Sequence, residues 1–195
     1  MKKLLTTLIF CGVAVGVSAG VRIIVPGAQD ISNGSSASID TWYIGGIGGN
    51  WFPVGQPNTQ NRRDRVIIRF DLSRYIDKGR IGRAVLLFSL EQFGRLRQEE
   101  LQLDHFTVER QLLTATDLIS PQVEKVTGLS LNPKMTQRLN YRLDVTRQVN
   151  ADLRRGFGMI AFRLLSNSAD QFGNPFNAPT GVNVIRETVK LSITE

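Results

Sequence analysis

Apolar and polar residues alternate along most of this chain, and this alternation is the feature that most restricts its fold. The stretch 65–71, for example, places Val66, Ile68 and Phe70 on one side of an extended backbone and its charged residues on the other. A period of two residues is typical of a strand with one buried face. The sequence therefore predicts an all-β protein, because the same pattern recurs at 21–25, 105–110, 141–145, 160–164 and 189–193.

One segment departs from this period. Val145, Val149 and Leu153 are spaced as on one face of a helix, so residues 146–155 are predicted to form a short amphipathic helix. Gly156 follows at a position where glycine commonly ends a helix. We expect this helix to pack across one end of the fold.

Short strands and long connections define the predicted architecture. The stretch 84–90 is apolar on both sides, which predicts a central strand covered on both faces. A helical turn is expected over 99–103. Long irregular segments at 45–64 and 166–181 contain many Gly, Asn and Pro residues. This organisation favours a single jelly-roll β-sandwich domain.

The chain has one His and one Cys among its 195 residues. These counts exclude a catalytic Cys–His pair, a zinc centre with several His ligands and a structural disulfide. His105 is expected to point outward from its strand, and a non-catalytic protein is predicted. The net charge of +7 is modest, and with no recognition motif it predicts no nucleic-acid partner.

Residues 1–19 have the organisation of a secretory signal peptide. Lys2 and Lys3 form the positive region, an apolar stretch follows, and cleavage is expected between Ala19 and Gly20. The alternative, a membrane anchor, needs a longer apolar run. We therefore predict a bacterial, secreted or cell-surface protein with one domain over 20–195 and no membrane span after cleavage.

Aromatic residues on both sides of a glycine-rich loop are candidate ligand contacts. They are Trp42 before the loop, and Trp51 and Phe52 after it. Flat aromatic rings can stack on the apolar faces of sugars. The alternative is that each ring belongs to the core or closes an end of the sandwich. Trp51 is the preferred ligand contact.

A basic run precedes the strand at 65–71. It contains Arg62, Arg63 and Arg65, and arginine forks bind carboxylates or sulfates in a bidentate manner. These side chains could therefore bind an anionic polysaccharide. The alternative, which we favour, is that these arginines are surface residues that contact only solvent.

Asp71 and Asp144 each follow a predicted strand. Carboxylates of this kind could help to hold a calcium ion, which prefers oxygen ligands. The alternative is that each accepts hydrogen bonds from nearby backbone N–H groups and caps the turn or helix that follows. We favour capping at both positions.

The chain is similar to one known family in several strings, which occur in the same order. These are Asn33-Gly-Ser-Ser-Ala-Ser-Ile39, Ile44-Gly45-Gly46, Arg65-Val-Ile-Ile-Arg-Phe-Asp-Leu-Ser73, Ile81-Gly-Arg-Ala-Val-Leu-Leu87, Leu143-Asp-Val-Thr146 and Gly156-Phe-Gly-Met-Ile-Ala-Phe-Arg163. They resemble the DNRLRE-domain family over residues 21–194. The resemblance implies a secreted jelly roll related to carbohydrate-binding modules, including alginate-binding ones.

The sequence and the resemblance together predict a secreted, non-catalytic module that binds an extracellular or cell-wall polysaccharide. If the arginines take part in binding, this polysaccharide is expected to be anionic. The alternative from another class is a structural cell-surface or matrix protein that self-assembles or binds other surface proteins. A small polysaccharide lyase or hydrolase is a third hypothesis.

Overall fold

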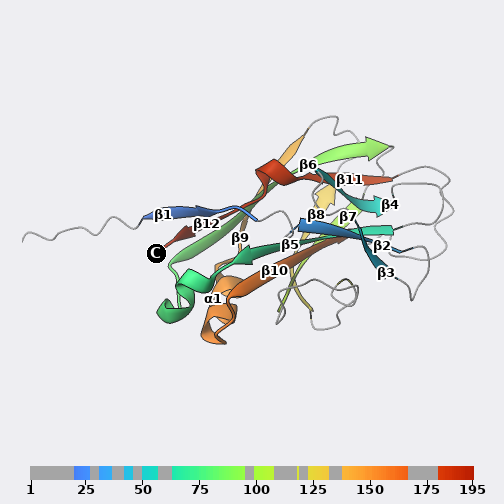
Figure 1. Ribbon diagram of the computed structural model, residues 1–195. Coiled ribbons are helices and arrows are strands. Elements are labelled where there is room, and N and C mark those ends of the chain that lie inside the picture. Colours follow the sequence, from blue (N-terminus) through green and yellow to red (C-terminus); the bar gives the residue numbers. More distant parts are fainter. Residues whose placement is uncertain are drawn as a thin grey trace, which may run out of the picture.

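The computed structural model describes residues 20–26, 31–36, 42–45, 50–56, 63–94, 99–107, 118, 123–131, 138–166 and 180–195. These residues confirm the predicted all-β fold (Figure 1). The strands are β1 (Val21–Ile24), β2 (Ile31–Ser36), β3 (Trp42–Gly45), β4 (Trp51–Gln56), β5 (Arg63–Asp71), β6 (Arg83–Gly94), β7 (Glu99–Phe106), β8 (Val123–Leu131), β9 (Leu139–Asp144), β10 (Met159–Ser166), β11 (Thr180–Ile185) and β12 (Lys190–Thr194).

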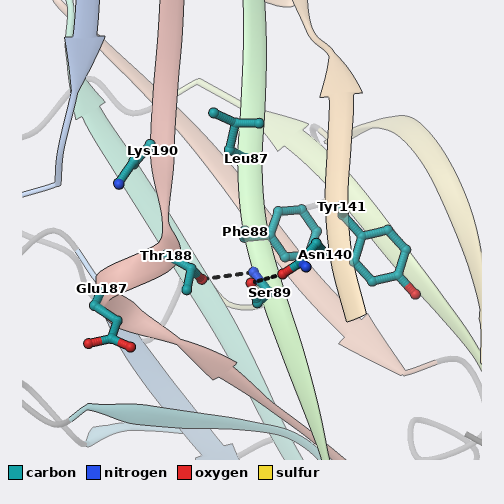
Figure 2. Close-up of a pocket in the computed structure, with 8 residues that line it drawn as sticks. All are labelled: Leu87, Phe88, Ser89, Asn140, Tyr141, Glu187, Thr188 and Lys190. Carbon is teal, nitrogen blue, oxygen red and sulfur yellow. Dashed lines mark hydrogen bonds between the residues drawn. The ribbon is translucent and has the colours of Figure 1, made fainter. Parts of the chain in front are cut away.

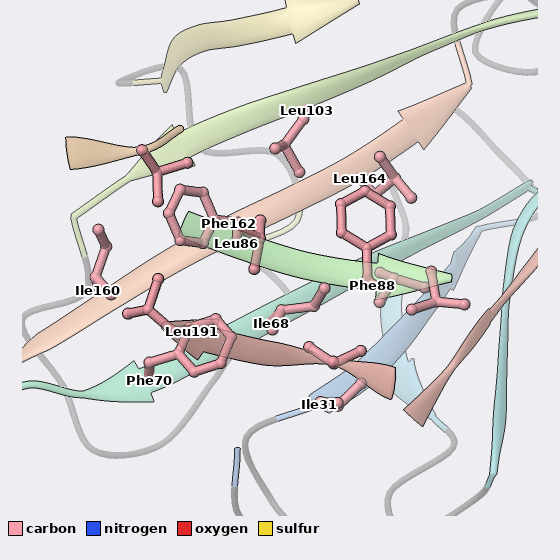
Figure 3. Close-up of a cluster of buried hydrophobic side chains, with 14 of the residues drawn as sticks. Ile31, Ile68, Phe70, Leu86, Phe88, Leu103, Ile160, Phe162, Leu164 and Leu191 are labelled. Atoms are coloured by element: carbon pink, nitrogen blue, oxygen red, sulfur yellow. The ribbon is translucent and has the colours of Figure 1, made fainter. Parts of the chain in front are cut away.

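All twelve strands belong to one antiparallel sheet that folds over on itself. Its order is β1-β12-β6-β11-β4-β5-β10-β7-β8, with β9 beside β6, β2 beside β5, and β3 beside β2. The part around β12, β6 and β9 faces the part around β5, β10 and β7, and their apolar side chains meet between the two layers (Figure 3). The fold is therefore sandwich-like, and the jelly-roll connectivity stays a prediction.

The core consists of the residues that the alternation selects. Phe70 of β5 and Phe162 of β10 are fully buried, and their rings meet edge to face with centroids 6.5 Å apart. Each buried side chain of this size contributes about 2 kcal/mol to folding. The opposite layer supplies Leu86 and Phe88 from β6 and Leu191 from β12.

A second set of buried side chains covers the outer face of β5 and β10. Ile67 and Ala161 have no exposed surface, and Leu118 is 1% exposed. Arg69 and Arg163 are also buried on these strands. Both faces of β5 are therefore covered, although only one of its faces is apolar in sequence.

Helix α1 (Thr146–Arg154) confirms the predicted helix. The amide of Asn150 accepts from the backbone N–H of Ile81 at 2.8 Å and donates to the Ile81 carbonyl at 3.2 Å, which fastens the helix beside β6. Gly156 has a φ of +78°, a left-handed conformation that ends the helix at small steric cost.

The expected helical turn over 99–103 is wrong, because these residues form the first part of β7. Leu101 and Leu103 project into the core, and β7 pairs with β10 on one side and β8 on the other. Pairing on both edges outweighs the weak helical tendency of its Glu, Gln and Leu residues.

Among the described residues, no helix has the length and apolar character needed to cross a membrane. The predicted signal peptide over 1–19 lies outside the described residues.

Candidate functional site

Trp51 is the most exposed aromatic side chain in the described part of the chain, with 61% of its surface accessible. It begins β4, where the next residue, Phe52, is 1% exposed and packs in the core. The alternation of the strand therefore directs Trp51 outward and Phe52 inward. The burial of Phe52 corrects the prediction that it contacts a ligand at the surface.

Trp51 belongs to a row of residues that crosses four strands. It lies opposite Ile185 of β11, and Ser89 of β6 lies opposite Asn140 of β9. Val184 pairs with Leu90, so the following residue, Ile185, comes beside Ser89. Partners across an antiparallel ladder project to the same face, so the row from Trp51 to Asn140 shares one outer face and spans roughly 14 Å.

A three-residue insertion interrupts this face. Strands β11 and β12 pair with successive parts of the same edge of β6, and the 3-10 turn η3 (Arg186–Thr188) lies between them. The Thr188 hydroxyl accepts from the Ser89 backbone N–H at 2.8 Å and donates to the Ile185 carbonyl at 2.6 Å. The Ser89 hydroxyl donates to Asn140 Oδ1 at 2.6 Å. Figure 2 shows the hydrogen bonds of Ser89 with Thr188 and with Asn140.

A shallow pocket of about 520 Å³ lies on the same face, next to η3. The rings of Phe88 and Tyr141 pack on the core side of β6 and β9, with their centroids 5.3 Å apart, and burial raises the pKa of Tyr141. The eight residues that line the pocket are Leu87, Phe88, Ser89, Asn140, Tyr141, Glu187, Thr188 and Lys190 (Figure 2).

The pocket carries one carboxylate and one ammonium group. Glu187 is 78% exposed and lies 3.4 Å from the guanidinium of Arg138. Lys190 is exposed and has no ion-pair partner among the described side chains. The Arg138–Glu187 pair compensates the carboxylate, so the remaining charge at the pocket is positive.

Of the predicted arginine run, Arg65 does not join this face. Arg62 lies outside the described residues, as does the side chain of Arg63. Arg65 is half-buried and donates to the backbone carbonyl of Leu118, which Arg163 also contacts at 2.7 Å. Arg65 is therefore held against the covered outer face of β5 and β10. The side chain of Trp42 also lies outside the described residues.

Asp71 and Asp144 cap turns, as the favoured interpretation predicts. Asp71 accepts from the Ser73 backbone N–H at 2.8 Å. Asp144 accepts from the Thr146 backbone N–H at 3.0 Å and from its hydroxyl at 2.6 Å. These hydrogen bonds lower the pKa of both carboxyls. In the described ranges, no group of three His, Cys, Asp or Glu side chains is arranged to hold a metal ion.

His105 differs most from its prediction. It is 5% exposed, and its Nε2 lies 2.9 Å from Oδ2 of Asp152 in α1, a residue with no exposed surface. Its Nδ1 lies 3.9 Å from Glu124 of β8, which forms an ion pair with Arg147. Both faces of β7 are covered, so alternation alone could not show which face holds the imidazole. The pair ties α1 to the sheet and is closed to substrates.

Sequence analysis missed Ser89, Asn140, Glu187, Thr188 and Lys190. They come from three separate segments, and only the pairing of β9 and β12 with β6 brings them together. They do not belong to a recognisable sequence motif, although Glu187 and Thr188, which lie between two strands, indicate a turn.

Comparison with protein-family models gives no match for this chain, and comparison with curated proteins gives none either. The resemblance to the DNRLRE-domain family stays a prediction.

Proposed function

We propose that this protein is a secreted, non-catalytic module that binds an extracellular polysaccharide on the face running from Trp51 to Asn140. The observation that carries this proposal is the 61% exposure of Trp51 on the same face as a polar pocket. An exposed Trp has a large, rigid apolar surface with a polar N–H at its edge, and this combination suits it to contact a ligand.

The chemistry of the face suits a sugar chain. Trp51 offers a flat ring for the apolar side of a sugar, while Asn140 and Thr188 offer an amide and a hydroxyl for its hydroxyl groups. The face is open and several strands wide, so it suits an extended ligand better than a small enclosed one.

The face is also organised before any ligand arrives. Ser89 is 3% exposed, and its hydroxyl and its backbone N–H are both hydrogen-bonded within the row. Binding to such a surface orders few side chains, and this reduces the entropic cost of association.

The ammonium of Lys190, which has no ion-pair partner among the residues that the structure describes, favours acidic sugars. It takes the place that the arginine run has in the sequence-based hypothesis. A binding role is favoured over hydrolysis because Glu187 is the only carboxylate that lines the described pocket. Glycoside hydrolysis commonly needs two facing carboxyl groups.

Isothermal titration calorimetry against neutral and acidic polysaccharides tests this proposal. We expect the wild type to bind at least one polysaccharide, and Trp51→Ala to weaken that binding at least tenfold. Val25→Ala is the matched control, because Val25 is also exposed, at 59%, but lies away from the row. Absence of binding by the wild type, or equal binding by Trp51→Ala, would contradict the proposal.

A structural, self-assembling role is the second candidate. Three exposed aliphatic side chains on and just after β1 favour it, because such residues are unusual on an edge strand.

A further inference from the structure

Strand β1 ends the sheet, and among the described residues it pairs with β12 alone. Val21, Ile23 and Val25 are 63%, 51% and 59% exposed. All three lie on the outer face, because the intervening Ile24 packs against the core. Within the described part of the chain, one edge of the sheet therefore combines backbone groups that lack a strand partner with a stripe of exposed aliphatic side chains; Figure 1 shows β1 beside β12.

As far as the described residues show, this edge lacks the usual protection against pairing. Natural edge strands are protected by charged side chains, bulges or covering segments. The one charged residue of β1 is Arg22, which lies on the opposite face from the stripe and pairs with Glu195 at 3.4 Å. The register of β1 with β12 is regular from Val21 to Ile24, so no bulge turns the edge away.

We propose that β1 pairs edge to edge with β1 of a second copy of this chain, in antiparallel orientation about a twofold axis at Ile23. Ile23 then lies opposite the partner's Ile23, Val21 opposite the partner's Val25, and Arg22 opposite the partner's Ile24. The stripe of each copy continues into the stripe of the other. No charged residue faces a like charge across the new ladder.

The charges of the edge explain why a second copy is the favoured occupant. Glu195 compensates Arg22, and it also pairs with Lys78, so two copies can approach along β1 without repulsion between unpaired like charges. The side-chain pattern of β1 is also self-complementary, because a twofold axis places the aliphatic residues of one copy against those of the other. A strand of another protein would match this pattern only if its aliphatic residues had the same spacing. A twofold contact uses the edge on both copies and closes at a dimer.

The consequence for the fold is one continuous sheet, β9-β6-β12-β1 of one copy joined to β1-β12-β6-β9 of the other. The proposed polysaccharide face lies on the outer side of the same layer, so the dimer would present two such faces. The pairing itself does not depend on polysaccharide binding.

Size-exclusion chromatography with light scattering, over a range of concentrations of the purified chain, tests the proposal. We expect a mass that rises with concentration to twice that of the protomer. Ile23→Lys places a charge at the centre of the pairing and should leave a monomer at every concentration. Because Ile23 is exposed, the variant should keep the unfolding temperature that the wild type has at low concentration, where it is monomeric.

Trp51→Lys is the matched control, since it replaces another exposed apolar side chain with the same charge away from the edge; it should still dimerise. A wild type that stays monomeric, a dimer that survives Ile23→Lys, or a dimer lost in Trp51→Lys would overturn the proposal. So would open-ended polymers.

Amide hydrogen exchange distinguishes edge pairing from stacking of the two sheet faces. Edge pairing should slow exchange in β1 as concentration rises, because outward N–H groups gain partners. Exchange in β1 that is the same for monomer and dimer would contradict the proposed ladder.

Discussion

The hydroxyl of Thr188 accepts a hydrogen bond from the backbone N–H of Ser89 at 2.8 Å, although Thr188 lies in the turn between two strands and not in the ladder. At this point η3 separates β11 from β12, so the Ser89 N–H of β6 has no backbone carbonyl of a neighbouring strand to bond. The Thr188 hydroxyl takes the place of that carbonyl as the acceptor. The same turn forms part of the pocket. The irregularity that interrupts the sheet is thus also the feature that shapes the candidate site.

Thr188→Val should reduce both stability and polysaccharide affinity. The substitution keeps the shape of the side chain but leaves the Ser89 N–H without its acceptor, and we expect a loss of about 1–2 kcal/mol in the free energy of unfolding. Urea denaturation and calorimetry measure the two effects. Thr194→Val, a half-buried threonine of β12 away from the pocket, is the control and should change little in either measurement.

Lys190→Gln should weaken binding of acidic polysaccharides several-fold while leaving neutral ones unaffected. The variant removes the one pocket cation without an ion-pair partner in the described residues. The salt dependence of acidic-ligand binding should fall with it. Lys125→Gln on β8 is the charge-matched control. Equal binding of acidic ligands by Lys190→Gln and the wild type would show that Lys190 does not contact the anion.

Asp144→Asn should destabilise the protein at neutral pH by less than about 1 kcal/mol, because the amide oxygen can still accept the hydrogen bonds from Thr146 but lacks the negative charge that strengthens them. The hydrogen bonds to Thr146, with a smaller contribution from Arg83, lower the folded-state pKa below the ordinary 3.8. The folded protein therefore binds fewer protons than the unfolded chain in that range. The stabilisation is complete above about pH 5 and is lost as the pH falls through the folded pKa.

Unfolding free energies of the wild type and Asp144→Asn, measured from pH 7 to pH 3, test this. The difference between the two proteins should shrink as the solution becomes acidic. A difference that is constant over this range would show that the charge of Asp144 does not contribute.

Asp152→Ala should cost about 3 kcal/mol of stability, because it leaves the buried imidazole of His105 without its 2.9 Å partner. The loss concerns the attachment of α1 to β7, and polysaccharide affinity should stay at the wild-type value. Glu124→Ala removes the longer, half-exposed contact at 3.9 Å and should cost less than 1 kcal/mol. If both variants unfold at the same denaturant concentration, the buried pair is not the dominant contact.

The alternation of residues predicted the core because the inner face of each strand is apolar whatever its neighbours are. Val66, Ile68 and Phe70 are buried as expected, and so is the helical face at Val149 and Leu153. These features depend only on the local spacing of apolar residues, and that spacing can be read directly from the sequence.

Residues whose environment depends on a distant segment could not be placed this way. Arg65 and His105 lie on strands with both faces covered, and Leu118 or α1 supplies the cover from far along the chain. The pocket likewise needs β6, β9 and η3 together. Trp51 was selected from its place after the glycine-rich loop, and its exposure agrees with a surface position, although the strand that it begins was not predicted.

The most direct test of the proposed binding face is to follow the backbone and indole N–H signals by NMR while a binding oligosaccharide is added. We expect the Trp51 indole signal to shift together with the signals of Ile185, Ser89 and Asn140, while those of β7 and α1 stay unchanged. Shifts confined to another surface, with the Trp51 indole unmoved at saturation, would contradict this expectation.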